Sequence, residues 1–275
     1  MDISVVIVSW NVKDRLRDNL VALMASSGLT FEIIVVDNAS SDKTAEMVES
    51  DFPNVRLISN ASNLGFAAAC NQGLKKATGR YMLLLNPDMR VFPDTLLKTL
   101  NWLDSNKQAA IAGIQLVGED GVNVPHVRHF PGLFDQCLIA SKVAHVAPFL
   151  LRHYLQKDFS YTEAARVDSI RGSFFVIRRE AYEAIGLFDE RYFVWFEEVD
   201  YCKMAEKLGL QVWYTPAAQC VDFVGQSFKQ ISITDTQKYF KESMFSYFAK
   251  WQPSWQLPIL RFAWAIGGLL VTILK

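Results

Sequence analysis

Asn86-Pro87-Asp88 is the first of two short stretches whose residue types could do chemistry. It follows an apolar run over residues 81–85 that is typical of a strand buried on both faces of a sheet. Proline cannot continue the strand ladder, so the strand should stop there. Ligands of open α/β sheets bind outside the carboxyl ends of the strands, and Mg²⁺ or Mn²⁺ prefers oxygen ligands such as a carboxylate. Asp88 is therefore a candidate metal ligand. The alternative is a turn whose side chains only cap backbone groups.

The second stretch is acidic and contains Glu197, Glu198 and Asp200. Apolar residues continue after it at helical spacing as far as Gly209, so the two glutamates should lie at or just before the start of a helix. The helix dipole favours ionised carboxylates at that end, which suits a general base. The alternative is that the glutamates only cap the helix.

The order of elements predicts a parallel sheet that positions these residues. Apolar strand patterns over residues 3–8, 31–36, 55–59 and 81–85 alternate with helical patterns, which indicates βαβ units with right-handed crossovers. Polar residues follow each strand (Asn11, Asp37, Asn63 and Asp88), and we expect them to converge at one edge as a nucleotide crevice. The sequence has neither GxGxxG nor GxxxxGK[ST], so a dinucleotide fold of that type or a P-loop is not indicated.

The middle of the chain is less regular. A helix over 93–104 and a strand over 109–117 precede a loose region from 118 to about 166. Its loop carries His126, Arg128 and His129, and we expect the two histidines to be solvated; a contact with a phosphate or with the acceptor is the alternative. Residues 133–155 are mostly apolar and predict a helical insertion, of the kind that forms a lid or acceptor surface.

Composition excludes several classes of protein. The 275 residues are 51% hydrophobic and 21% charged, which predicts a globular chain with a sizeable core. A net charge of −1 argues against broad nucleic-acid binding. The four cysteines are scattered without zinc-binding spacing, as in a reduced, cytoplasmic protein, and the start of the chain does not resemble a signal peptide.

The C-terminal segment is the most apolar part of the sequence. Residues 257–274 are apolar except for Arg261 and Thr272, and Trp255 and Trp264 accompany them. Because Arg261 interrupts the run, a helix lying in the interface on the inner face of the cell membrane is favoured over a full span. A buried core helix or a dimer contact is the alternative.

Five stretches taken together resemble glycosyltransferase family 2, and within it the rhamnosyltransferase-like enzymes of O-antigen and other cell-surface polysaccharide synthesis. They are VVIVSWN, EIIVVDNASSD, NLGFAAACNQGLKKATGRYMLLLNPD, RGSFFVIRREAYEAIGLFDERYFVWFEEVDYC and the late DFVGQS, in the order and spacing of that family from about residue 3 to 227. The resemblance implies a GT-A fold and inverting transfer from a nucleotide-sugar. The apolar C-terminal run described above predicts a helical, membrane-associating extension beyond this catalytic domain.

The resemblance also assigns roles to residues. Asp88 corresponds to the metal ligand of the family's DxD, with Asn86 in place of the first Asp. Glu198 corresponds to the base, and Glu197 and Asp200 stay open as alternatives. Asp222 stands where relatives often have a metal-binding His. The nucleotide-sugar is assigned to a set of residues around the strand ends: Ser9, Asn11, Asp37, Asn38, Ser40, Asn63, Asn71, Asn86 and Gly172.

The prediction for the whole chain follows. Residues 1–235 should form the GT-A domain, with a nucleotide-sugar half over 1–117 and an acceptor half over 118–235, and residues 236–275 the helical membrane segment. The expected reaction moves rhamnose from dTDP-rhamnose to a lipid-linked or polysaccharide acceptor, with Mg²⁺ or Mn²⁺. A sugar nucleotidyltransferase and a non-catalytic scaffold of the same fold are the alternatives, and an oligomer is possible.

Overall fold

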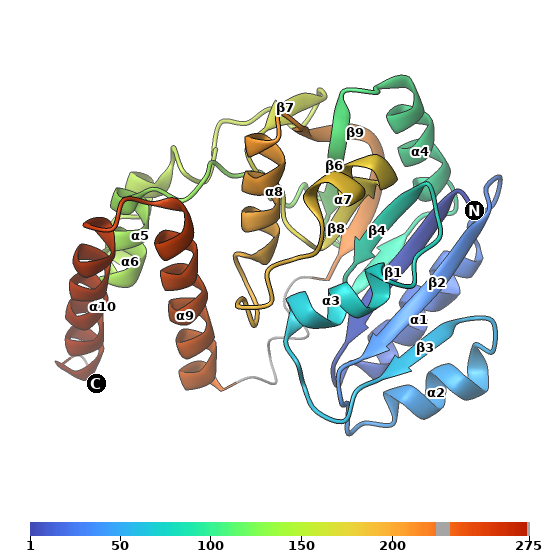
Figure 1. Ribbon diagram of the computed structural model, residues 1–275, viewed down its shortest axis with the longest axis horizontal. Coiled ribbons are helices and arrows are strands. Elements are labelled where there is room, and N and C mark those ends of the chain that lie inside the picture. The colour runs from blue at the N-terminus through green and yellow to red at the C-terminus, as the bar shows by residue number, and fades with distance from the viewer. Residues whose placement is uncertain (224–231, 274–275) are drawn as a thin grey trace.

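The computed structural model describes residues 1–223 and 232–273, the side chains as far as Leu269, and in them one nine-stranded sheet with helices on both faces (Figure 1). The strands are β1 Ile3–Ser9, β2 Phe31–Asp37, β3 Arg56–Ser59, β4 Tyr81–Leu85, β5 Met89–Val91, β6 Ala109–Val117, β7 Ala165–Val167, β8 Phe174–Arg178 and β9 Gln211–Asp222. The helices are α1 Lys13–Met24, α2 Thr44–Asp51, α3 Phe66–Leu74, α4 Thr95–Ser105, α5 Leu133–Ala140, α6 Val143–Val146, the 3₁₀ turn η1 Pro148–Leu151, α7 Arg179–Ile185, α8 Glu197–Lys207, α9 Ile233–Trp251 and α10 Gln256–Ile273.

The sheet is mostly parallel, as the sequence predicts. Its order is β3-β2-β1-β4-β8-β6-β9-β5, with β7 paired to β9 off this path. The strands β1, β2, β3, β4, β6 and β9 run one way and β5, β7 and β8 run the other. Since β8 lies between β4 and β6, the two predicted halves of the GT-A domain share this one sheet.

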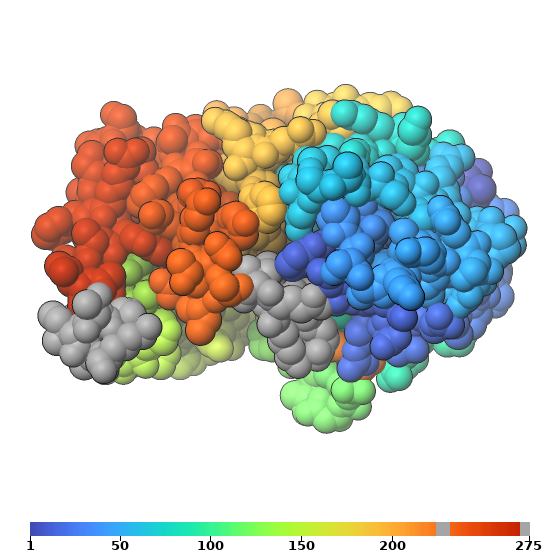
Figure 2. Space-filling view, turned by 90° about the horizontal axis from the view of Figure 1, so that it is seen from below, coloured from blue at the N-terminus to red at the C-terminus, as the bar shows by residue number. Residues whose placement is uncertain are grey.

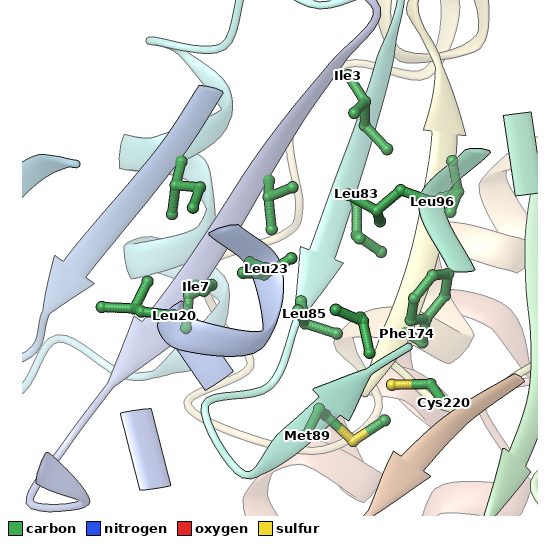
Figure 3. Packing of buried hydrophobic residues seen from close by; sticks show 14 of the residues in the cluster. Ile3, Ile7, Leu20, Leu23, Leu83, Leu85, Met89, Leu96, Phe174 and Cys220 are labelled. Atoms are coloured by element: carbon green, nitrogen blue, oxygen red, sulfur yellow. The ribbon is translucent and has the colours of Figure 1, made fainter. Parts of the chain in front are cut away.

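Each face of the sheet has its own core. Side chains of β1 and β4 pack under α1, α2 and α4 on one face, and Figure 3 shows Ile7 and Leu83 near Leu20 and Leu23 of α1. The small residues of α3, such as Ala67 and Ala69, pack on the other face together with α7 and α8. These apolar periodicities place the carboxyl ends of the parallel strands at one edge of the sheet.

The two C-terminal helices form a separate layer with its own core. Met244 and Phe248 of α9 and Leu260 and Ala263 of α10 are buried against α5 and the segment that precedes α8. Figure 2 shows α9 and α10 in orange and red at one end of the molecule, opposite the blue N-terminal strands and helices. The layer therefore borders the start of α8, where the predicted base lies.

The structure changes two expectations for this region. The insertion over 133–155 is helical only in three short pieces, α5, α6 and η1. One face of α10 packs against α5 so closely that a Cβ added to Gly267 would overlap the carbonyl oxygen of Ala140. Part of α10 is thus core, as the alternative interpretation held. No helix within residues 1–223 and 232–273 combines the length and apolar character needed to cross a membrane.

Candidate active site

A cavity of about 440 Å³ lies where the carboxyl edge of the sheet meets the helical layer. Its lining includes Ile139 of α5 and Phe240 of α9 from the helical side. Eight of the residues predicted from the sequence line it: Asn38, Asn63, Asn86, Asp88, Gly172, Glu197, Glu198 and Asp222. The structure thus brings both predicted acidic clusters into one cavity.

Asp88 and Asp222 come together through one strand ladder. The short strand β5 begins at Met89, which pairs antiparallel with Asp222 at the end of β9, and the Phe223 N–H donates to the Asp88 carbonyl oxygen (3.2 Å). Both residues are nearly buried: Asp88 is 4% exposed and Asp222 is 6% exposed. The remainder of the DFVGQS motif, residues 224–227, lies outside the described residues.

One guanidinium stands beside this pair. Arg171 Nη1 lies 3.2 Å from Asp222 Oδ2 and forms an ion pair with it. Within the described residues no group of three or more His, Cys, Asp or Glu side chains could enclose a metal ion. Two carboxylates nevertheless suit Mg²⁺ or Mn²⁺, since Mg²⁺ is commonly held by one or two carboxylates together with substrate phosphates and water. The donor set at Asp88 and Asp222 fits such an ion.

Glu197 and Glu198 form the first turn of α8. Each has a buried Oε2 atom without a hydrogen-bond partner among the described residues. Burial, together with the neighbouring Glu198 charge, raises the pKa of Glu197 well above its ordinary value. Burial also raises the pKa of Glu198, but the Arg128 and Arg171 guanidinia oppose that rise. Contrary to the expectation from the helix dipole alone, desolvation dominates for both groups.

The backbone before α8 is strained. Trp195 and Phe196 both adopt left-handed conformations, with φ of 65° and 68°. Bulky residues rarely adopt this conformation, which costs of order 1–3 kcal/mol and is found most often at functional sites. The turn is held by close packing: a Cβ added to Gly65 would lie 2.6 Å from the Phe193 carbonyl oxygen. This packing fixes how the two glutamates enter the cavity.

Asp200 lies elsewhere, although the sequence offered it as a base. It is fully buried and is not part of the cavity lining. Its carboxylate accepts hydrogen bonds from Lys250 Nζ (2.7 Å), Trp251 Nε1 (2.6 Å) and Tyr192 Oη (3.1 Å). Asp200 therefore joins α8 to α9 and does not face the space in which a substrate would bind.

Four of the predicted nucleotide-contacting residues form a polar cluster at the ends of β1 and β2. Ser9 and Asp37 are paired across the ladder, and Ser9 Oγ and Asp37 Oδ1 are buried without hydrogen-bond partners among the described atoms. The Asn11 N–H donates to Ser40 Oγ (2.9 Å), and the Ser40 N–H donates to Asp37 Oδ2 (3.1 Å). These residues lie beside the cavity and not in its lining.

The predicted asparagines have different structural roles. Asn38 donates to Asn63 Oδ1 (2.8 Å) and to the Gly65 carbonyl oxygen (3.1 Å), which shapes the loop before α3. Asn71 donates to the Phe188 carbonyl oxygen (2.9 Å) and accepts from the Phe188 N–H (2.9 Å), so it ties α3 to the segment before α8. Asn71 is buried and does not line the cavity.

Sequence reasoning missed some of the cavity residues. His126 is not solvated as expected: it is 2% exposed, and burial lowers its pKa to about 4. Its Nδ1–H donates to the Val124 carbonyl oxygen (3.1 Å), and Nε2 is left as a buried acceptor without a partner in the described chain. Arg128 and Tyr154 also line the cavity, while His129 instead pairs with Asp168 (2.9 Å). Only long-range packing distinguishes His126 from His129, which the local sequence does not reveal.

The glycosyl transferase family 2 profile matches residues 4–186, about two thirds of the chain. The chain belongs to glycosyltransferase family 2. It is thus a glycosyltransferase, and the nucleotidyltransferase and scaffold alternatives lose their support.

Two curated relatives of this family 2 chain are rhamnosyltransferases by name. The N-acetylglucosaminyl-diphospho-decaprenol L-rhamnosyltransferase of Mycobacterium tuberculosis is 26% identical over 97% of the chain and 89% of the relative. Rhamnosyltransferase WbbL of Escherichia coli is 25% identical over 80% of the chain and 82% of the relative.

Solved structures share the fold of this family 2 chain. The mannosyltransferase PcManGT from Pyrobaculum calidifontis, solved with GDP-Man and Mn²⁺, matches 98% of the chain and 74% of its own length with a TM-score of 0.60 and 18% identity. S. aureus TarS 1–349 matches 91% of the chain and 73% of its own length with a TM-score of 0.57 and 16% identity. The predicted GT-A fold is confirmed.

Proposed function

We propose that this glycosyltransferase moves rhamnose from dTDP-rhamnose to a lipid-linked glycan in cell-surface polysaccharide synthesis, with inversion at the anomeric carbon. The observation that carries the proposal is the position of Glu198 in the same cavity as Asp88 and Asp222. A base for the acceptor and two ligands for a counter-ion of the leaving diphosphate are the two things that such a transfer needs.

Glu198 is the proposed base. The acceptor hydroxyl oxygen attacks the anomeric carbon, its proton passes to the Glu198 carboxylate, and the bond between that carbon and the diphosphate oxygen breaks. The nucleoside diphosphate leaves with the bonding electron pair, and a single displacement of this kind inverts the anomeric centre. The Arg128 and Arg171 charges support Glu198 over Glu197, because they oppose the pKa rise of Glu198 and so favour its ionised form.

Asp88 and Asp222 are the proposed ligands of Mg²⁺ or Mn²⁺. The ion would stabilise negative charge on the leaving diphosphate. Arg171 beside Asp222 and Arg128 in the lining add positive charge on this side of the cavity. On the nucleoside side, Ser9, Asp37 and Ser40 offer polar groups, among them the two buried oxygens without partners.

The sugar and the acceptor are proposed from the relatives. Two of them are named rhamnosyltransferases, and the name of one includes an N-acetylglucosaminyl-diphospho-decaprenol, a sugar joined to a polyprenyl chain through diphosphate. A lipid-linked acceptor of this class would reach the cavity from the side of the helical layer.

A donor screen tests the proposal. The purified protein is incubated with single nucleotide-sugars and Mn²⁺, with and without a polyprenyl-diphosphate-linked sugar, and nucleoside diphosphate is measured. dTDP-rhamnose should give the fastest acceptor-dependent release, and NMR of the product should show an inverted linkage. Release of pyrophosphate, or transfer with retained configuration, would contradict the mechanism.

The metal is tested separately. Asp88→Asn should remove activity and Mn²⁺ binding measured by electron paramagnetic resonance, and a chelator should have the same effect on the wild type. Asp120→Asn, at an exposed position, is the matched control and should change neither. Full activity of the chelated wild type would show that the enzyme needs no metal.

A further inference from the structure

Exposed apolar side chains are concentrated in the helical layer. Of the eighteen large hydrophobic side chains exposed in the described residues, ten lie within residues 134–150 and 255–269. We call these ten the apolar face: Phe134, Val143, Val146, Phe149, Leu150, Trp255, Ile259, Phe262, Ile266 and Leu269. Soluble proteins rarely leave such a concentration open unless it meets a partner.

The elements that carry the apolar face pack on one another. Helix α10 contacts α5, α5 contacts α6, and α6 contacts η1. Figure 2 shows the yellow-green segment of the insertion at the same end of the molecule as the orange and red helices α9 and α10. The face is therefore carried by one packed unit and not by scattered surface positions.

Helix α10 has one apolar side that is buried and another that is exposed. Leu260, Ala263 and Gly267 are buried against the protein, whereas Ile259, Phe262, Ile266 and Leu269 are exposed at a spacing of three and four residues. Spacing of this kind places the exposed side chains in one stripe along the helix. Since the buried side already holds α10 in place, the exposed stripe is available to contact a bilayer or a partner.

The net charge of these elements is positive. Residues 252–269 contain no Asp or Glu and one basic residue, the exposed Arg261. Residues 133–158 contain Lys142, Arg152 and Lys157 and two acidic residues, Asp135 and Asp158, of which Asp158 pairs with Arg152. Neither Arg261 nor Lys142 forms an ion pair with a described residue; each instead lies over an aromatic ring, Arg261 at 5.7 Å from Phe245 and Lys142 at 5.3 Å from Trp264.

We propose that the apolar face docks the protein on a bilayer that contains anionic phospholipid, with α10 lying in the plane of the interface. The stripe of α10 would enter the acyl boundary, while Trp255 and the Arg261 side chain reach the headgroups, as Trp and basic residues do at interfaces. Anionic headgroups would neutralise charges that the protein leaves unpaired. A second copy fits less well, because a two-fold contact would bring the unpaired Arg261 and Lys142 charges of both copies to one contact surface.

Docking gives a reason for the placement of the cavity. Ile139 of α5 and Phe240 of α9 line it from the helical layer that carries the apolar face. A docked molecule would therefore hold the cavity near the bilayer surface. The docking proposal depends on lipid binding alone and stands whether or not the donor is dTDP-rhamnose.

Vesicle co-sedimentation of the full chain tests the proposal without any sugar. The wild type should sediment with vesicles of phosphatidylcholine and phosphatidylglycerol, and less with phosphatidylcholine alone. The double variant Phe262→Glu, Leu269→Glu should partition at least tenfold less, because each change removes an apolar side chain that the bilayer would bury and adds a negative charge that anionic headgroups repel. Val146→Glu on α6 should weaken binding in the same direction.

Controls come from exposed apolar residues elsewhere. Val21 on α1 (59% exposed) and Leu208 after α8 (54% exposed) match the face residues in exposure, so Val21→Glu and Leu208→Glu should sediment like the wild type. Arg261→Glu should reduce the preference for anionic lipid, and Arg261→Lys should keep it. Thermal unfolding confirms that each variant is folded.

Several outcomes would overturn the proposal. One is a wild-type protein that does not sediment with anionic vesicles. Another is an equal loss of vesicle binding in the control variants and the face variants. A third is a wild-type dimer by light scattering that Phe262→Glu or Val146→Glu converts to a monomer, which would make the face a contact between copies. A charge variant on the face that binds as well as the wild type would also contradict it.

Discussion

At the residue scale, the two adjacent glutamates are separated by their surroundings. Glu197 is buried beside the charge of Glu198, whereas Glu198 faces the charges of Arg128 and Arg171. A proton shared by such a pair would reside preferentially on Glu197. The arrangement leaves Glu198 as the carboxylate that can accept a proton.

The first prediction tests this assignment. Glu198→Gln keeps the shape of the side chain but cannot accept a proton, so turnover should fall by about 10²–10⁴. Donor affinity, measured by calorimetry, should stay near the wild-type value. Glu197→Gln is the matched control and should lose less than Glu198→Gln. If Glu197→Gln is the more severe change, the base lies one residue earlier.

The second prediction concerns the acid limb of the pH profile. A carboxylate base loses activity when it is protonated, and the pKa of Glu198 is raised from an ordinary value of 4.5. Activity should therefore begin to fall at a pH above 4.5 as the solution is acidified. Arg171→Met removes a charge that opposes this rise, so its acid limb should move to still higher pH. A limb that moves to lower pH, measured as kcat/KM against pH, would contradict the role of Arg171.

The third prediction concerns stability and Glu197. Its pKa is raised in the folded state, so the folded protein holds this proton more tightly than the unfolded chain does. The stabilisation is fully present below pH 4.5 and is lost as the pH rises through the folded-state pKa. Glu197→Gln should therefore raise the unfolding temperature more at pH 8 than at pH 4. An equal change at both values would show that the carboxylate is ionised without penalty.

At the scale of elements, the link between α8 and α9 is a buried cluster of charge. Lys250 Nζ donates to both Asp189 (3.0 Å) and Asp200 (2.7 Å), and Trp251 donates to Asp200. Tyr192 Oη also donates to Asp200, so three hydrogen bonds compensate the cost of burying this carboxylate. The cluster fixes the helix whose first turn carries Glu197 and Glu198.

The fourth prediction separates support from catalysis at Asp200. Asp200→Ala should lower the free energy of unfolding by about 3–5 kcal/mol, because it removes one of the two carboxylates of Lys250 and leaves the Trp251 and Tyr192 donors without their acceptor. Chemical denaturation measures this loss. Glu206→Ala removes the partner of Lys203 in an exposed pair and should cost about 0–1 kcal/mol. The folded fraction of the Asp200→Ala variant should keep the acid limb in its profile of kcat/KM against pH. Loss of that limb would make Asp200 the base.

Sequence patterns predicted the elements because their causes are local. Buried strands such as residues 81–85 and the start of α8 follow from apolar periodicity and turn residues within each segment. The partners of Asp200 and the burial of His126 depend on segments far apart in the chain, which periodicity does not report. Several candidate residues at the strand ends thus line the cavity, while the division of the candidates into cavity lining and support needed the three-dimensional structure.

At the scale of the whole molecule, the C-terminal helix belongs to two environments. Leu260 is fully buried in the core of the helical layer, while Phe262, two residues later, is 68% exposed. The sequence alone suggested a segment that could be separated from the catalytic domain. The structure instead makes α10 a wall of the layer that borders the cavity.

The fifth prediction follows from this position. Deleting residues 257–275 should uncover the core formed by α5 and α9, so the truncated protein should unfold at lower temperature and bind a hydrophobic dye. Leu260→Ala should reproduce part of the effect and cost about 2–5 kcal/mol. Ile259→Ala, at a 43% exposed position, is the matched control and should cost much less. A truncated protein as stable as the full chain would show that α10 is dispensable for folding.

The pairing of β5 with β9 determines when β5 can join the sheet during synthesis. Among the described strands, β5 pairs with β9 alone, and about 120 residues separate them. At a translation rate of about 5–20 residues per second, roughly 6–24 s pass between the emergence of the two strands. During that time Asp88 has been synthesised and Asp222 has not. A nascent chain should therefore acquire both carboxylates of the proposed metal site only when β9 is complete.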